Sequence, residues 1–213
     1  MSDTGDHPFT ELIRGRTTVE RFDARRGLDE TEVRALVRDA VQAPSSFNIQ
    51  HWRFVAVRRP DDKRRLMEAA YGQQQVADAA VTFIVLGDTR GADKLPLIVE
   101  RAVGQGALAD GKAAAWVRLA ERIYADPTVA RDEAIRSASL AAMVLMLAAE
   151  ARGLGSGALS GFDAGRVRRE FAIDQRYVPV MLLCVGHPAS VSGERQPRLS
   201  VDEVLSFDRG RVF

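Results

Sequence analysis

The sequence predicts a β-sheet covered by helices, an α/β or α+β sandwich. Two segments, 79–87 and 178–186, are apolar almost without interruption and rich in β-branched residues, as expected of buried strands. Helical patterns lie between the predicted strands along the chain, so helices are available to cover the sheet. The 213 residues, with 46% hydrophobic content, suffice for one sizeable core, and no repeat or linker divides residues 1–213. We therefore expect a single domain.

The first predicted helix begins after Asp29. Asp29 and Glu32 have the spacing of a capping box, and apolar residues then recur at helical intervals as far as Val41. Pro44 disfavours helical geometry in the residue before it, so the helix ends there. A short strand over 53–58 is expected to follow.

The remaining segments alternate between helices and strands. The centre of the longest predicted helix, 137–149, is apolar or small on every side, which predicts burial all round. The Gly/Ser-rich stretch GLGSGALSGFD (153–163) predicts a helix cap and a turn. The further predicted helices are 61–70, two or more within 91–129 interrupted near Gly104–Gly111, 131–152 and 164–171.

Composition excludes several classes of function. The net charge of +1 gives no basic surface for nucleic acid or an anionic membrane. Phosphate-loop, HExxH, CxxC and GxSxG motifs are missing from the sequence, and its three histidines are far apart, so no metal site is predicted. Cys184, the only cysteine, lies in an apolar run and is interpreted as a small buried hydrophobe. The N-terminus shows no secretory signal, and 137–149 is shorter than the roughly 20 residues of a membrane span. We expect a cytoplasmic protein.

Polar and small residues gather in three places. RGRTTVERF (14–22) precedes the first helix, and APSSFNIQHWRF (43–54) connects that helix to the first strand. GALSGF (157–162) and ERQPRL (194–199) form the third. So many hydrogen-bonding groups in tight connections suit a site that holds a flat polar ring.

Together these stretches resemble the flavin-binding signature of the FMN-dependent nitroreductase family. The family has Arg-x-Ser/Thr near its N-terminus, then A-P-S-x-x-N-x-Q-P-W-x-F, a Gly-Leu-Gly turn ending in Gly-Phe, and a late arginine, in the order found here. The resemblance implies an α+β nitroreductase-like fold with a central, mostly antiparallel sheet flanked by helices, and a homodimer with an intertwined C-terminal arm. It also implies an oxidoreductase that transfers hydride by a ping-pong mechanism through flavin N5. NADH or NADPH would be the donor, and an electron-poor small molecule, such as a nitroaromatic or quinone, the acceptor.

The resemblance also implies the cofactor-binding residues, and their chemistry agrees. Guanidinium groups match phosphate with paired donors, and neutral hydroxyl and amide groups match the edge of a flavin ring. Ser160 and Gly161 are expected near flavin N5, and Gln75, with Gln73 as the alternative, near the pyrimidine carbonyls. Because the flavin carries the chemistry, no catalytic side chain is predicted. The predicted cofactor-binding residues are Arg16, Thr17, Thr18, Pro44, Ser45, Ser46, Asn48, Gln75, Ser160, Gly161, Arg195 and Arg198.

The resemblance further implies that residues 44–48 reach the flavin of the other subunit. The site would then be complete only in a homodimer, and the apolar helix 131–152 would pack against its twin. Segment 91–129 is expected to cover the active site. Trp52, which closes the second stretch, is interpreted as a core residue.

Three positions depart from the family pattern. Glu20 stands where many relatives have Arg or Lys, and Gln75 where they often have Lys, which predicts a lower flavin potential. His51 replaces the usual proline and is interpreted as a surface histidine, with a titratable group beside the substrate as the alternative. Other flavin reactions on the same fold stay open, namely dehalogenation, enal reduction and flavin destruction. So do a flavin-binding protein without turnover and a dimeric scaffold without flavin.

Overall fold

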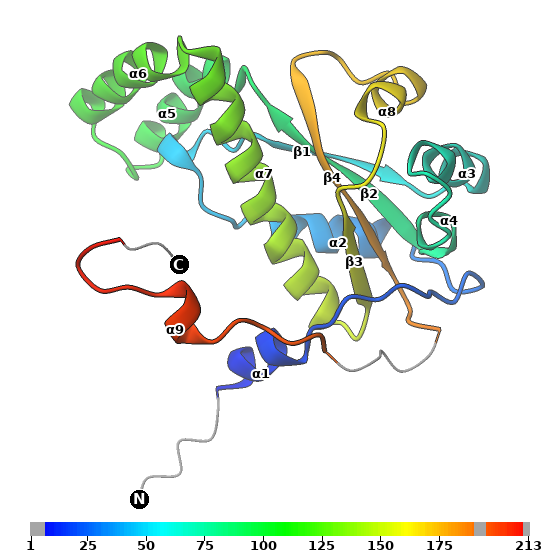
Figure 1. Ribbon diagram of the computed structural model, residues 1–213. Helices are drawn as coiled ribbons and strands as arrows, with labels where there is room; N and C mark the ends of the chain where they lie inside the picture. The colour runs from blue at the N-terminus through cyan, green and yellow to red at the C-terminus, as the bar shows by residue number, and fades with distance from the viewer. Residues whose placement is uncertain (1–6, 190–194, 211–213) are drawn as a thin grey trace, which may run out of the picture.

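An antiparallel sheet of four strands lies at the centre of the computed structural model, which describes residues 7–189 and 195–210 (Figure 1). Its strand order is β1-β2-β4-β3, and every neighbouring pair is antiparallel. The predicted sheet, mostly antiparallel and flanked by helices, is confirmed. The strands are β1 (Trp52–Val57), β2 (Val81–Asp88), β3 (Gly155–Leu159) and β4 (Tyr177–Gly186).

Helices cover both faces of the sheet. The predicted helices over 61–70, 131–152 and 164–171 are confirmed with small shifts of their ends. In the first predicted helix, the Asp29 carboxylate accepts a hydrogen bond from Glu32 N–H (2.8 Å) and the Glu32 carboxylate accepts one from Asp29 N–H (2.7 Å), so the capping box is present. The α-helices are α1 (Pro8–Gly15), α2 (Glu30–Ala40), α3 (Pro60–Ala69), α4 (Gln75–Asp78), α5 (Leu95–Gly104), α6 (Asp110–Tyr124), α7 (Pro127–Glu150), α8 (Ala164–Glu170) and α9 (Val201–Val204). Two 3-10 turns are η1 (Ser46–Asn48) and η2 (Gly91–Lys94).

The apolar core forms one layer on each face of the sheet. On one face α2 and α7 pack against the strands, and on the other α3, α4 and α8 do. Trp52 is buried in the first layer, which confirms its interpretation as a core residue. Cys184 is buried in the second layer, and burial raises the pKa of its thiol to about 12, so it is a small hydrophobe as predicted.

The stretch 153–163 is not only a cap and a turn, because Gly155–Leu159 forms the edge strand β3. Glycine has low strand propensity, which hid this strand in the sequence. Its glycines are required by packing: a Cβ at Gly155 would lie 2.5 Å from Val19 Cγ2, and a Cβ at Gly157 would lie 2.7 Å from the Val19 oxygen. Thr18 and Ser156 pair in a parallel bridge, so the N-terminal segment runs directly along β3.

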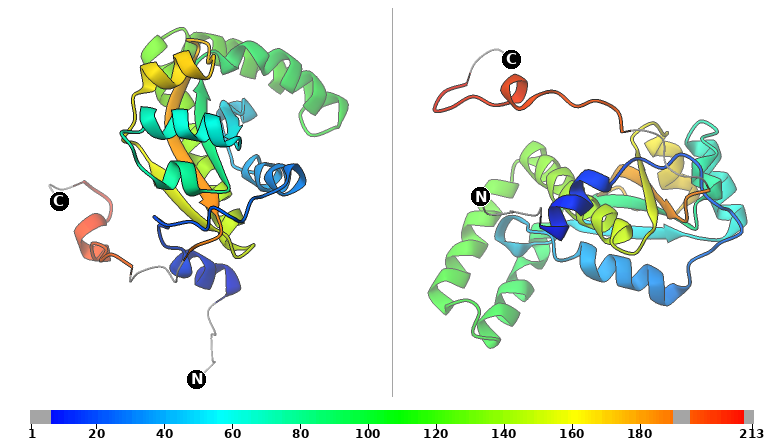
Figure 2. Two further views of the ribbon diagram at one scale, coloured as in Figure 1. Left: turned by 90° about the vertical axis from the view of Figure 1, so that its right-hand side faces the viewer. Right: turned by 90° about the horizontal axis from the view of Figure 1, so that it is seen from below.

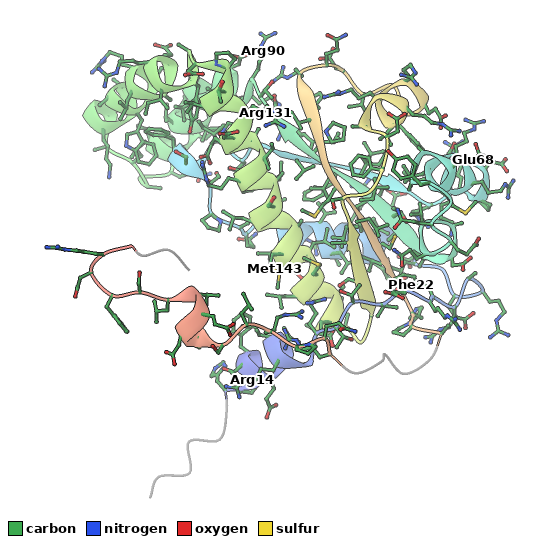
Figure 3. The ribbon with its side chains drawn as sticks, viewed as in Figure 1. Arg14, Phe22, Glu68, Arg90, Arg131 and Met143 are labelled. Atoms are coloured by element: carbon green, nitrogen blue, oxygen red, sulfur yellow. The ribbon has the colours of Figure 1, made fainter. Side chains whose placement is uncertain are left out.

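A single chain does not bury 137–149 on all sides, and the predicted burial against a second copy stays a prediction. Leu140 and Met143 of α7 are 42% and 38% exposed, and Figure 3 labels the position of Met143 along this helix. Among the described residues, none of the helices combines the length and apolar character that crossing a bilayer requires.

Residues 195–210 form an arm that runs past α1 and away from the sheet (Figure 2). Its large apolar side chains are exposed, with Leu199 at 68% and Phe207 at 82%. The sequence did not predict α1, α4 or α9, which are short helices of eight, four and four residues. In α9, Ser200 and Glu203 form a capping box of their own.

Candidate functional site

The predicted cofactor residues fall into two groups that a single chain does not bring together. We call residues 16–18, 73–75 and 160–161 the β3 site, and residues 45–50 the 45–50 loop. Pro44 directly precedes this loop, and Arg195 and Arg198 lie in the arm. In Figure 1 the light-blue loop between α2 and β1 lies on the side of α7 where α5 and α6 are, whereas β3 and α4 lie on the opposite side. Within 7–189 and 195–210, no hydrogen bond, ion pair or ring contact joins the two groups.

The β3 site is built by three segments that are far apart in sequence. Val19 N–H donates to the Ser156 oxygen at 2.9 Å, which fixes the segment before it along β3. The Gln73 amide donates to two backbone oxygens, that of Ala70 (2.9 Å) and that of Gly161 (2.8 Å). The turn after β3 is therefore tied to the end of α3.

Gly161 presents an open backbone at this site. Its φ is not in the left-handed region, and the nearest atom to a Cβ built there is Gln73 Nε2 at 3.7 Å. Neither backbone conformation nor packing within the chain requires glycine at this position. Gly161 N–H donates to no group in the part of the chain that the structure describes. An exposed N–H without a covering side chain suits close approach by a flat ligand.

A cavity of about 600 Å³ lies beside these residues. Both candidate glutamines, Gln73 and Gln75, line it. Glu20, which departs from the family pattern, lines the same cavity. The lining residues are Glu20, Arg21, Phe22, Gln73, Gln74, Gln75, Asp78 and Ala189.

The predicted phosphate-binding arginines occupy different surroundings. Arg16 is half-buried at the end of α1, where its Nη1 donates to the Thr17 oxygen at 2.9 Å. Arg195 reaches the same end of α1 and donates to the Arg14 oxygen at 2.8 Å, where Figure 3 labels Arg14 beside the arm. Arg198 is exposed, and its guanidinium donates to Gln196 and Pro197 oxygens within the arm. Arg195 thus contacts the same end of α1 as Arg16, whereas the hydrogen bonds of Arg198 lie within the arm.

The 45–50 loop has a strained backbone. Phe47, Asn48 and Gln50 have φ angles of 51°, 56° and 58°, a region that non-glycine residues seldom adopt. Each such residue costs about 1–3 kcal/mol and persists only where its surroundings determine it. Ser45 Oγ accepts a hydrogen bond from Gln50 N–H at 2.9 Å, which closes the loop.

Side chains from α6 hold this loop from inside the molecule. The Phe47 ring meets Trp116 and Tyr124 edge to face, at 5.7 and 6.4 Å between ring centroids. The Tyr124 hydroxyl also hydrogen-bonds the side chain of Ser46, and burial raises the pKa of Tyr124. Segment 91–124 therefore packs on the 45–50 loop.

His51 is fully buried below this loop, so its interpretation as a surface histidine is wrong. Its Nδ1 lies 2.8 Å from the Asp88 oxygen, and because a carbonyl only accepts, Nδ1 carries the proton. The ring packs against Tyr124, and Nε2 has no partner among the described residues. Burial lowers the pKa of His51, which keeps the ring neutral. The residue precedes β1, so strand alternation could not place its side chain.

The Asp88 carboxylate, at the end of β2, is a second buried support that sequence reasoning missed. It is fully buried and accepts hydrogen bonds from Arg176 Nε (2.9 Å) and Nη2 (2.8 Å), with Arg53 Nη2 at 3.4 Å. Arg53 also donates to the Gln50 oxygen at 2.9 Å, which connects this ion-pair cluster to the 45–50 loop. An acidic residue after an apolar run carries no sequence signal for such pairing.

Comparison with known proteins gives a consistent result along nearly the whole chain. The profile of the nitroreductase family matches residues 13–187. The chain is 32% identical to "Putative NAD(P)H nitroreductase YodC" of Bacillus subtilis, over 92% of this chain and 97% of that protein. It is 27% identical to the "CLA biosynthesis enone reductase" of Lactiplantibacillus plantarum, over 86% of this chain and 87% of the relative.

Solved structures agree. A crystal structure described as a "putative nitroreductase in complex with FMN" from Exiguobacterium sibiricum superimposes with a TM-score of 0.87 at 27% identity. The superposition covers 97% of this chain and all of that chain.

Proposed function

The chain belongs to the nitroreductase family, and we propose that it is an FMN-dependent NAD(P)H oxidoreductase that works as a homodimer. Relatives named as NAD(P)H nitroreductases and a structural neighbour described in complex with FMN support the cofactor and the donor. Electron-poor small molecules such as nitroaromatics or quinones are the proposed acceptors.

The observation that carries the proposal is the open backbone of Gly161. A ligand supplies the reason for glycine there that the chain's own packing does not, and the free N–H offers that ligand a hydrogen bond. The neutral amides of Gln73 and Gln75 line the adjoining cavity and suit the donor and acceptor atoms of a flavin edge. When bound, FMN supplies the hydride chemistry between nicotinamide and acceptor.

The chain's own residues would bind and orient this cofactor. Arg16, with Arg195 beside it, would pair with the phosphate, and the Thr17 and Thr18 hydroxyls would add donors. The Ser160 hydroxyl and Gly161 N–H would donate to the redox edge of the ring. We keep Arg198 as a candidate that would need the arm to move or to meet a second copy.

The second subunit would complete the site with its 45–50 loop. Pro44, Ser45, Ser46 and Asn48 cannot reach the β3 site of their own chain, because α7 lies between. Leu140 and Met143 on α7, and the exposed apolar residues of the arm, offer the surface on which a second copy would pack. We propose that α7 packs against its twin and that the arm wraps the partner.

Reduction of an electron-poor C=C bond is a second candidate function. The relative named as an enone reductase favours it, since the similarity extends over most of both chains. Both reactions would use the same flavin site and differ in the acceptor.

The experiment is a visible spectrum of the purified protein with added FMN, followed by anaerobic titration with NADH and NADPH. We expect a bound-flavin spectrum that one or both nicotinamides bleach, and that a quinone, nitroaromatic or enone restores. A protein that ignores FMN would contradict the cofactor, and one that binds FMN without bleaching would be a carrier or sensor.

We also propose a low flavin midpoint potential, because the cavity presents Gln75 where relatives often have lysine, together with the Glu20 and Asp78 carboxylates. A cation there would stabilise the anionic reduced flavin. Gln75→Lys should raise the potential by roughly 30 mV or more, about 1.4 kcal/mol for a two-electron couple. A redox titration in which the variant matches the unmodified protein would contradict this.

A further inference from the structure

Gln73 connects the end of α3 to the turn after β3, and its partner in that turn lies 88 residues away in sequence. Its Nε2 donates to the Ala70 oxygen, at the end of α3, and to the Gly161 oxygen, in the turn after β3. Both partners are carbonyl oxygens, which only accept, so the NH₂ group must face them and Oε1 must face away. Both amide hydrogens are therefore used to hold the backbone.

The hydrogen bond to Gly161 fixes one of the two peptide planes that meet at this residue. The other plane is held because the Ser160 oxygen accepts a hydrogen bond from Phe162 N–H at 3.2 Å. Glycine lets both planes rotate more freely than any other residue does. Holding both planes therefore determines the direction of the Gly161 N–H, which has no partner among the described residues.

The turn has one further support from the same helix. Asp163 N–H donates to the Ala69 oxygen at 2.8 Å, so the carbonyls of the last residue of α3 and of the residue after it hold the turn, the first directly and the second through Gln73. The direct bond positions the start of α8, whereas only the Gln73 bond reaches the peptide of Gly161.

We propose that Gln73 is a positioning residue of the flavin site: by clamping the Gly161 carbonyl, it aims the Gly161 N–H at the redox edge of the ring. The inference rests on the proposed function. It assigns Gln73 a role through Gly161, separate from the direct contact with the pyrimidine carbonyls predicted for Gln75.

The amide is the only uncharged side-chain group that offers two hydrogens from one atom. In Gln73→Glu, a carboxylate would face two carbonyl oxygens and could donate to neither. Protonation at lower pH gives that carboxyl one hydrogen and restores one bond. A variant that recovers on acidification is therefore the signature of donation by residue 73.

The test uses Gln73→Glu and Gln73→Ala, with Gln175→Glu as the matched control. Gln175 is an exposed glutamine between α8 and β4, outside the site, and its substitution makes the same change of charge. The dissociation constant for FMN is measured from pH 5 to pH 8, and hydride transfer from NADH is timed in a single turnover at both ends of that range. The charged groups near residue 73 are the same in every variant, so each curve is compared with that of the unmodified protein; they are Glu20, Arg21, Asp78 and Asp163.

Gln73→Ala should bind FMN about tenfold more weakly at every pH, which corresponds to roughly 1.4 kcal/mol. It should also be reduced up to about a hundredfold more slowly, as expected for a group misplaced by about 1 Å. Gln73→Glu should have the same FMN affinity and reduction rate as Gln73→Ala at pH 8, and it should recover part of both at pH 5. Gln175→Glu should follow the unmodified protein throughout.

Equal affinity and rate in Gln73→Ala and the control would overturn the inference, as would a Gln73→Glu variant without recovery at pH 5. Both outcomes differ from failure of the proposed function, in which the unmodified protein itself would not bind FMN. Melting temperatures of the FMN-free variants separate loss of the clamp from loss of the fold.

Discussion

The 45–50 loop and the turn after β3 are both expected to contact the cofactor, yet different forces hold them. Three non-glycine residues of the loop have left-handed backbone, and the loop is held from inside by aromatic packing and by the buried His51. The turn has no left-handed residue among 158–163 and is held by two hydrogen bonds, from Asp163 N–H to the Ala69 oxygen and from Gln73 to the Gly161 oxygen. The loop should thus depend on the stability of the core beneath it, and the turn on individual hydrogen bonds.

The largest effect is expected from removing the buried support of the loop. Asp88→Ala leaves Arg176 and Arg53 without their carboxylate, and breaking such a pair costs about 3–5 kcal/mol of unfolding free energy. Urea denaturation measures this. The control is Glu30→Ala, which removes an exposed pair with Arg34 on α2 and should leave the midpoint unchanged. Equal midpoints for the two variants would show that the cluster does not support the fold.

Gly157 in β3 and Gly161 in the turn after it should respond differently to substitution by alanine: the first in stability, the second in FMN affinity. Gly157→Ala forces a methyl group against the Val19 oxygen and should cost about 1–3 kcal/mol of unfolding free energy, with overpacking as the cause. The Cβ of Gly161→Ala would have no atom closer than 3.7 Å, so the free energy of unfolding should stay the same while FMN affinity falls. Thermal melts and FMN titrations of both variants check this. If Gly161→Ala melted early and bound FMN normally, the open backbone would be a structural feature and not a binding one.

A smaller effect should follow from pH, through His51. Burial lowers the pKa of His51 in the folded state from the usual 6.5. Below about pH 6.5 the unfolded chain therefore binds a proton at this histidine, whereas the folded chain keeps it neutral. The free energy of unfolding should fall as pH decreases from about 6.5, by at most about 1.4 kcal/mol per pH unit, down to the folded-state pKa. In His51→Gln, which can still donate to the Asp88 oxygen, this slope should disappear. If the free energy of unfolding changed equally with pH in His51→Gln and in the unmodified protein between about pH 7 and 5.5, the burial of a neutral His51 ring would be contradicted.

The sequence predicted most elements of the fold because their signals are local. The capping box of Asp29 and Glu32 and the β-branched runs of β2 and β4 determine structure within a few residues. β3 escaped because packing against Val19, which the sequence does not reveal, demands its glycines.

The candidate site was predictable only in part, for the same reason. Residue types pointed to both the loop and the turn through their resemblance to a family. His51 was misjudged because its partner is the backbone of Asp88, 37 positions away. The hydrogen bond from Gln73 to the Gly161 oxygen was not predicted because the two residues lie 88 positions apart. Side chains whose role depends on a distant backbone atom leave no pattern in a single sequence.

The claim that two copies share each site is tested most directly by mixing two blocked variants. Pro44→Trp obstructs the loop and Gly161→Trp the turn, and both positions are exposed in the single chain. Each variant alone should bind no FMN. Co-expressed with different tags and purified through both, the mixed dimer should hold one intact site out of two and bind about half an equivalent of FMN per chain. A doubly tagged dimer that stays colourless with excess FMN would contradict the shared site.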